Sequence, residues 1–157
     1  MKRRSKIVIG FLIVLLVIQF IQPARNKNGQ VLPSDFLSAY SAPQNLQALI
    51  KNACYDCHSN NTRYPWYANI QPFGWWLSHH IKEGKKELNL SEFGSYTHRR
   101  QLSKLKNIRS SIQDGSMPLA SYTLIHKTAK FSEEQKKIVI DWLDKIRDSL
   151  MNNTGVH

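Results

Sequence analysis

The chain has 157 residues, enough for one domain with short appendages, and it contains no internal repeat or low-complexity tract. Its formal net charge is +11, which favours acidic protein partners or anionic headgroups through long-range attraction. A nucleic acid is not expected as a partner, because the chain contains no nucleic-acid-binding motif.

The N-terminal segment has the pattern of a membrane anchor. Basic residues at positions 2, 3, 4 and 6 precede a nearly unbroken apolar run from Ile7 to Ile21. The end of this run lacks the small side chains of a cleavage site, so an uncleaved anchor is favoured over a cleaved signal peptide or a buried core helix. The positive-inside rule places residues 1–6 in the cytoplasm. We therefore predict that residues 7–24 form a transmembrane helix that crosses the cytoplasmic (inner) membrane. The bulk of the chain would then lie in the periplasm.

The rest of the chain divides into three parts by composition. Residues 25–33 are polar and contain Gly29, which predicts a linker. Residues 34–150 have the composition of a globular domain, and residues 151–157 are expected to form a disordered tail.

The domain is predicted to be helical throughout. Apolar residues recur every three or four positions in residues 43–53, 97–112 and 132–150. Ser132 and Gln135 form a capping box at the start of the last segment. No segment shows the sustained alternation of a half-buried strand. The predicted fold class is therefore all-α, with a transmembrane helix in front of a small helical domain.

The helix predicted at residues 97–112 has one strongly basic side. Charged helix faces are usually solvated, so we interpret this side as facing solvent rather than as a docking site. The basic residues are Arg99, Arg100, Lys104, Lys106 and Arg109.

The most informative motif is Cys54-Tyr55-Asp56-Cys57-His58, which contains both cysteines of the chain. C-x-x-C-H is the attachment signature of a c-type haem, in which two thiols join the porphyrin and the adjacent histidine ligates the iron. We predict one haem c per chain, attached through Cys54 and Cys57, with His58 as the proximal ligand. The alternatives are a structural disulfide, a dithiol redox centre, or a zinc site completed by His79 and His80.

A second iron ligand is expected downstream of the motif. Proline disfavours helical geometry at the preceding residue, so Met117 before Pro118 is predicted to lie in a loop. Its soft sulfur suits haem iron. We predict Met117 as the distal ligand, with His80 as the alternative because His80 shares a helical face with apolar residues.

Three residues that follow the motif are candidates for the wall of the haem pocket. Arg63 would pair with a haem propionate, and Trp66 and Tyr67 would supply apolar surface and hydrogen bonds. An ordinary aromatic core is the alternative interpretation.

The order of these elements resembles class I cytochrome c. More narrowly, A-C-Y-D-C-H-S-N-N-T-R-Y-P-W-Y, W-L-S-H-H-I-K-E-G-K-K-E-L-N and M-P-L-A-S-Y-T-L-I-H resemble the bacterial haem-binding domain family over residues 39–150. The resemblance implies a cytochrome c-like helical domain wrapped around one haem, commonly with one N-terminal membrane segment. It also implies Cys54 and Cys57 as attachment sites, His58 as the proximal ligand and Met117 as the distal ligand.

The leading functional hypothesis is a membrane-tethered, mono-haem electron carrier with an acidic redox partner protein. No catalytic residue is assigned, because an electron carrier has no substrate of its own. An open iron position would instead indicate a peroxidase-like, gas-binding or sensor module. A third hypothesis is a haem subunit of a larger membrane complex.

Overall fold

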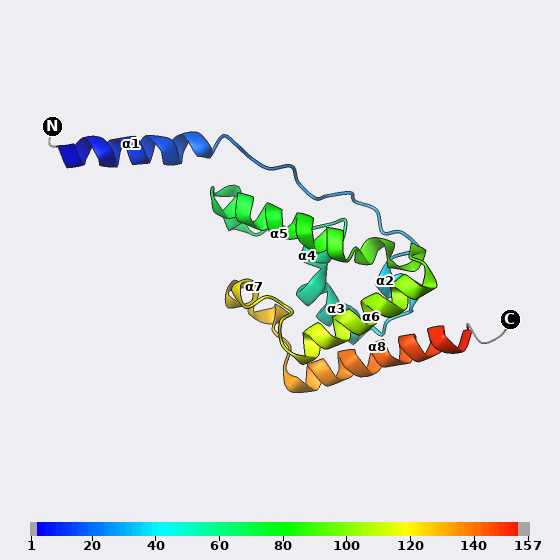
Figure 1. The fold of residues 1–157 in the computed structure, drawn as a ribbon. Helices are drawn as coiled ribbons and strands as arrows, with labels where there is room; N and C mark the ends of the chain where they lie inside the picture. The colour runs from blue at the N-terminus through cyan, green and yellow to red at the C-terminus, as the bar shows by residue number, and fades with distance from the viewer. Residues whose placement is uncertain (1–2, 154–157) are drawn as a thin grey trace.

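The structure is a computed structural model that describes residues 3–153 (Figure 1). The described residues form helices and no β-strand, apart from an isolated bridge between Lys27 and Asn61, so the all-α prediction is confirmed. The α-helices are α1 (Arg3–Ile18), α2 (Phe36–Ala39), α3 (Gln44–Ile50), α4 (Asp56–His58), α5 (Phe73–Glu87), α6 (His98–Gln113), α7 (Ala120–Ile125) and α8 (Glu133–Asn153). The other helical turns are the π-helical η1 (Lys51–Tyr55) and the 3-10 helices η2 (Trp66–Asn69), η3 (Leu90–Ser95) and η4 (Lys127–Ala129).

The first helix is shorter than the predicted membrane anchor. α1 has 16 residues and ends at Ile18, and it starts with Arg3 and Arg4. At a rise of about 1.5 Å per residue it extends about 24 Å, less than the ~30 Å of hydrocarbon in a bilayer. Between residues 3 and 153, no helix has both the length and the apolar character that crossing a membrane requires. The predicted transmembrane helix at residues 7–24 and the predicted inner-membrane location facing the periplasm are therefore wrong.

Residues 25–33, predicted as a linker, lie against the loop that follows the Cys54–His58 motif. The side-chain amide of Asn26 donates hydrogen bonds to the Ser59 carbonyl oxygen and to Thr62 Oγ1, each at 2.9 Å. The backbone N–H of Asn26 donates to Tyr64 Oη at 2.7 Å. This segment is consequently bound to the domain surface along part of its length. By contrast, α1 buries none of its side chains and projects away from the other helices (Figure 1).

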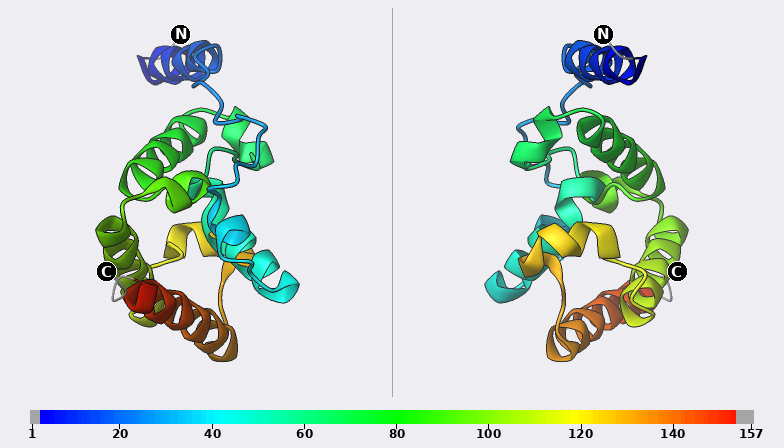
Figure 2. Two further views of the ribbon diagram at one scale, coloured as in Figure 1. Left: turned by 90° about the vertical axis from the view of Figure 1, so that its right-hand side faces the viewer. Right: turned by 90° about the vertical axis from the view of Figure 1, so that its left-hand side faces the viewer.

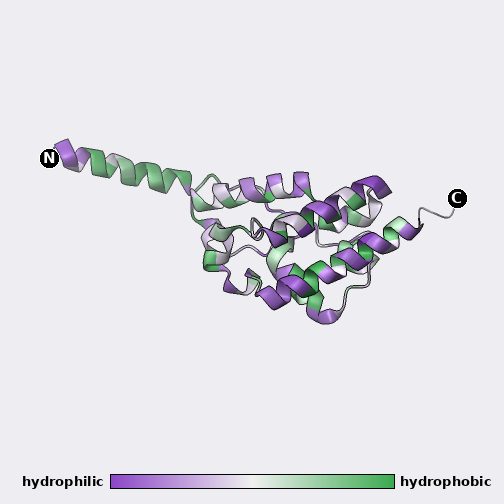
Figure 3. Ribbon diagram, turned by 60° about the horizontal axis from the view of Figure 1, so that its bottom comes forward, coloured by the Kyte–Doolittle hydropathy of each residue, from purple (hydrophilic) through white to green (hydrophobic). Residues whose placement is uncertain are grey.

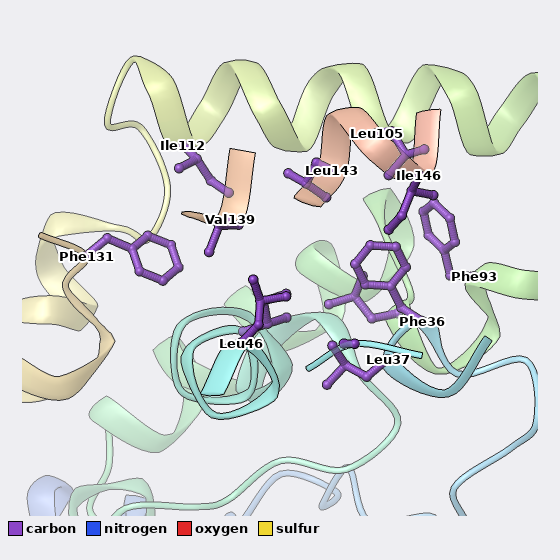
Figure 4. Packing of buried hydrophobic residues seen from close by; sticks show 13 residues of the cluster. Phe36, Leu37, Leu46, Phe93, Leu105, Ile112, Phe131, Val139, Leu143 and Ile146 are labelled. Atoms are coloured by element: carbon purple, nitrogen blue, oxygen red, sulfur yellow. The ribbon is translucent and has the colours of Figure 1, made fainter. Parts of the chain in front are cut away.

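The main core lies between the α6–α8 pair and the short helices α2, α3 and η3. Figure 3 shows that α6 and α8 each carry hydrophobic and hydrophilic residues on the same helix, as amphipathic helices at a core boundary do. The hydrophobic side chains from these elements meet in the interior (Figure 4). Each buried side chain of this kind stabilises the fold by about 1.5–3 kcal/mol. They include Phe36, Leu46, Phe93, Leu105, Ile112, Val139 and Leu143.

A smaller cluster holds α5 against the other side of the motif. It consists of Tyr67 and Ala68 from η2 with Leu77 and Ile81 from α5, and Cys57 packs against it. In Figures 1 and 2, α5 and α8 lie at opposite ends of the helical body. Cys54 packs against the main core, and Cys57 packs against the smaller cluster. The motif is therefore held between two separate hydrophobic clusters.

The start of the last helix follows the capping prediction. The Ser132 backbone N–H donates to Gln135 Oε1 at 2.9 Å, and the Gln135 N–H donates to Ser132 Oγ at 3.2 Å. This reciprocal pair is the predicted capping box. α8 continues to Asn153, so the first three residues of the predicted tail are helical, and residues 154–157 lie outside the described part of the chain.

Candidate functional site

A cavity of about 230 Å³ lies beside the motif, and it is called the central cavity below. Cys54, His58 and Met117 all line it, although Met117 is distant from the other two in the chain. Most of the remaining wall is apolar, and Figure 4 shows several of these side chains, from α6, α8 and the segment before α8, pointing toward one another. The other apolar lining residues are Phe36, Ile50, Ala53, Leu88, Leu90, Ile108, Ile112, Pro118, Phe131, Val139 and Leu143.

The motif is built on two consecutive helical turns, which a buried carboxylate holds in place. Cys54 lies in η1, a π-helical turn of a kind that is frequent at functional sites, and Asp56 begins α4. Asp56 is buried, and its Oδ2 accepts a hydrogen bond from Tyr122 Oη at 2.7 Å. Its Oδ1 accepts from the backbone N–H of Arg63 at 3.1 Å and from Arg63 Nε at 3.2 Å. Asp56 thus ties the motif to α7 and to the loop that follows it.

The ring of His58 is oriented by two backbone carbonyl groups. Nδ1 lies 2.9 Å from the Gly84 oxygen and 3.1 Å from the Leu88 oxygen, both at the C-terminal end of α5. Carbonyl oxygens only accept hydrogen bonds, so Nδ1 carries the proton and Nε2 carries the free lone pair. Burial lowers the pKa of His58, which the two carbonyl contacts partly offset, and the ring is neutral at physiological pH. A neutral imidazole with its second nitrogen fixed is the form that ligates a metal.

Close packing between α5 and the motif requires a glycine at position 84. A Cβ added to Gly84 would lie 2.9 Å from the Cys57 carbonyl oxygen and 3.4 Å from His58 Cε1. Any side chain would therefore push the end of α5 away from the motif. The absence of a side chain lets the Gly84 carbonyl reach the His58 ring.

The two cysteines are free thiols in different surroundings. Cys54 lines the central cavity, whereas Cys57 packs against the cluster of Tyr67, Leu77 and Ile81 and does not line the cavity. Burial raises the pKa of Cys54 to about 12 and that of Cys57 to about 11. Both thiols are consequently protonated at neutral pH in this structure.

Met117 lies in the loop between α6 and α7, as predicted. α6 ends at Gln113, and Gly115 follows with a φ of 76°, a left-handed conformation that glycine adopts without strain. The Met117 N–H donates to the Ser111 carbonyl oxygen at 3.0 Å, which holds the loop against the last turn of α6. Met117 is 38% exposed and lines the central cavity together with Pro118. Met117 therefore lies at the edge of the cavity, in contact with solvent.

The three predicted pocket residues lie outside the central cavity. The exposed side chain of Arg63 pairs with the buried Asp56, and Trp66 is 74% exposed. Tyr67 is buried in the smaller cluster, where its Oη lies 2.9 Å from Nε2 of His126. None of the three is among the residues that line the cavity.

The histidines of α5 also lie away from the cavity. His80 Nδ1 is 2.9 Å from the Trp76 carbonyl oxygen, and its ring packs on the Trp76 ring with centroids 4.2 Å apart. In the part of the chain that the structure describes, no group of three or more His, Cys, Asp or Glu residues is arranged to hold a metal ion. The zinc alternative with His79 and His80 thus has no support from the structure.

The sequence interpretation missed several polar residues that line the cavity. Lys104, Asn107 and Ser111 come from α6, and Glu87 comes from the end of α5. Lys104 belongs to the side of its helix that was predicted to face solvent. The spacing of Lys104 to Ile108 and Ile112 was the available signal, because residues four apart share a helical face.

The chain was compared with known protein families, curated proteins and solved structures. The model of a family described as "Haem-binding domain" matches residues 13–145. No curated protein and no solved structure matches the chain.

Proposed function

The chain belongs to the haem-binding domain family, and on this premise we propose that it carries one covalently attached haem c and transfers electrons. Haem binding itself follows from the family. The covalent attachment, the iron ligands and the role in electron transfer are inferred from the residues of the site.

The observation that carries the proposal is the composition of the central cavity. Its wall is mostly apolar and includes the thiol of Cys54, the neutral imidazole of His58 and the thioether of Met117. These groups fit a haem, because the porphyrin needs an apolar environment and its iron accepts nitrogen and thioether ligands. His58 supports the fit further, since its Nδ1 is occupied by the Gly84 and Leu88 carbonyls and Nε2 is left for the iron.

Covalent attachment is supported by the motif rather than by the positions of both thiols. Cys54 and Cys57 have the C-x-x-C-H spacing, and Cys54 and His58 line the central cavity. Cys57 lies on the adjoining turn, packed against the smaller cluster.

Electron transfer is favoured over catalysis because two protein ligands would occupy the iron. Haem iron supplies a one-electron couple, and Met/His ligation raises its reduction potential relative to bis-His ligation. With His58 and Met117 on the iron, no position remains for a substrate. The exposed side of Met117 brings this edge of the cavity near the surface, where a partner can approach.

The test combines attachment and ligation in the full chain. Replacing Cys54 and Cys57 by Ser should abolish the covalently retained haem seen as a pyridine haemochrome, whereas retention would contradict attachment. Met117→Ala should remove the thioether-to-iron charge-transfer band of the ferric protein. Met151→Ala, which changes an exposed methionine outside the cavity, should leave that band intact. If the wild-type protein lacks the band, the assignment of Met117 as an iron ligand is wrong, and an open iron position would then favour a peroxidase-like or gas-binding function.

We also propose that the redox partner presents an acidic surface. Arg99, Arg100 and Lys106 are exposed on α6, the helix that forms one wall of the central cavity. Exposed charges steer association, and salt screens them within about 10 Å at 0.1 M ionic strength. The rate of electron transfer to an acidic partner should therefore fall as salt is added. A rate independent of salt would contradict an electrostatically guided partner.

A further inference from the structure

Three polar side chains of α6 line the central cavity, whose wall is mostly apolar. Lys104, Asn107 and Ser111 are spaced by three and four residues, so they follow one face of the helix. Lys104 is the only lysine or arginine among the lining residues. Haem carries two propionate carboxylates at one edge of an apolar ring, so a cavity that receives haem needs a polar place for them.

Lys104 has few close partners for a charged side chain that is mostly buried. Its side chain is only 20% exposed, and its one ion pair among the described residues is with Glu87, at 3.8 Å. The Glu87 side chain is 78% exposed, so most of its charge is already solvated by water. An ammonium group removed from water costs free energy unless close partners replace the lost hydration. This arrangement leaves Lys104 able to gain from a second anion inside the cavity.

Lys104 and the predicted proximal ligand, His58, face the same cavity. His58 lines the central cavity from α4, and Lys104 lines it from α6. A haem held by His58 would therefore lie within reach of the Lys104 charge. The alternative candidate, Arg63, is bound to Asp56 and lies outside the cavity.

We propose that Lys104, together with the amide of Asn107 and the hydroxyl of Ser111, binds the propionate carboxylates of the haem. This rests on the proposed haem site and adds the residues that orient the ring within it. The ammonium supplies the opposite charge, and the amide and hydroxyl donate hydrogen bonds to the carboxylate oxygens. Glu87 remains at the rim as the solvent-side partner of Lys104.

One experiment compares haem with its dimethyl ester, which lacks the propionate charges. Both are titrated into the full chain produced without attached haem. Wild type should bind haem about 10- to 100-fold more tightly than the diester, the range expected for a charge-assisted hydrogen bond. Lys104→Met should lose most of this preference while binding the diester as wild type does. Lys104→Arg should keep the preference, and Lys106→Met, which changes an exposed lysine of the same helix, should not alter it.

A second measurement uses the protein with its haem covalently attached. The propionate bending bands in the resonance Raman spectrum report hydrogen bonding to the carboxylates, and they should shift in Lys104→Met but not in Lys106→Met. A preference for haem that persists in Lys104→Met, or unshifted bands, would overturn the proposal. Failure of wild type to take up either form of haem would instead contradict the proposed function itself.

Discussion

Replacing Gly84 by alanine tests how tightly α5 packs against the motif. The added Cβ would lie 2.9 Å from the Cys57 carbonyl oxygen and 3.4 Å from both Cys57 Cβ and His58 Cε1. Overpacking costs about 1–3 kcal/mol, and a backbone oxygen cannot rotate away, so the upper part of this range applies. Alanine regains about 0.8–1.0 kcal/mol through its higher helix propensity. We expect Gly84→Ala to lower the free energy of unfolding by about 1–2 kcal/mol.

The assay is denaturant unfolding of the full haem-loaded chain, followed by circular dichroism and by the haem absorption spectrum. Gly10→Ala is the matched control, because Gly10 is also helical but has no atom within 4 Å of its added Cβ. α1 buries no side chain, so this control should leave the stability of the domain within about 0.5 kcal/mol of wild type. The haem spectrum should change only in Gly84→Ala, since the Gly84 carbonyl orients the His58 ring.

The sign of the change in unfolding free energy shows whether α5 packs tightly against the motif. If Gly84→Ala were as stable as wild type, or more stable by about the helix-propensity term, α5 would not press on the motif as the structure shows. If the variant were destabilised but its haem spectrum unchanged, the packing of α5 would not set the orientation of the His58 ring. That result would contradict the role given to the Gly84 carbonyl.

Two further predictions concern Tyr122 and the thiols. Tyr122→Phe removes the donor to the buried Asp56 carboxylate, and denaturation should show a loss of about 1.5–3 kcal/mol. Thr123→Val, which removes only a local bond to Ala120, should change little, and equal losses in both variants would argue against the role of Asp56. In the chain made without haem, the raised pKa values of Cys54 and Cys57 should make alkylation at neutral pH slower than in the denatured chain, with Cys57 reacting first. Equal rates in the folded and denatured chain would contradict thiol burial.

The sequence by itself determined the features that depend on neighbours in the chain. Helical spacing of apolar residues predicted an all-α domain, and the capping box at Ser132 and Gln135 marked where α8 begins. The Met117-Pro118 pair correctly placed Met117 in a loop, and Gly115 ends the preceding helix in a left-handed conformation. These features follow from short-range sterics and hydrogen bonding, so a single segment contains the information.

Only the tertiary structure decided what covers each face and where each element stops. The apolar run that begins at Ile7 predicted a membrane anchor, yet α1 ends at Ile18 and no described helix can span a bilayer. Arg63 follows the motif directly but is taken by Asp56, whereas Lys104, predicted to face solvent, lines the central cavity. Helical periodicity tells which residues share a face, but the partner that buries this face comes from elsewhere in the chain. For that reason the motif alone was enough to predict a haem. The residues that surround the motif became known only from the way α5, α6 and α8 pack around it.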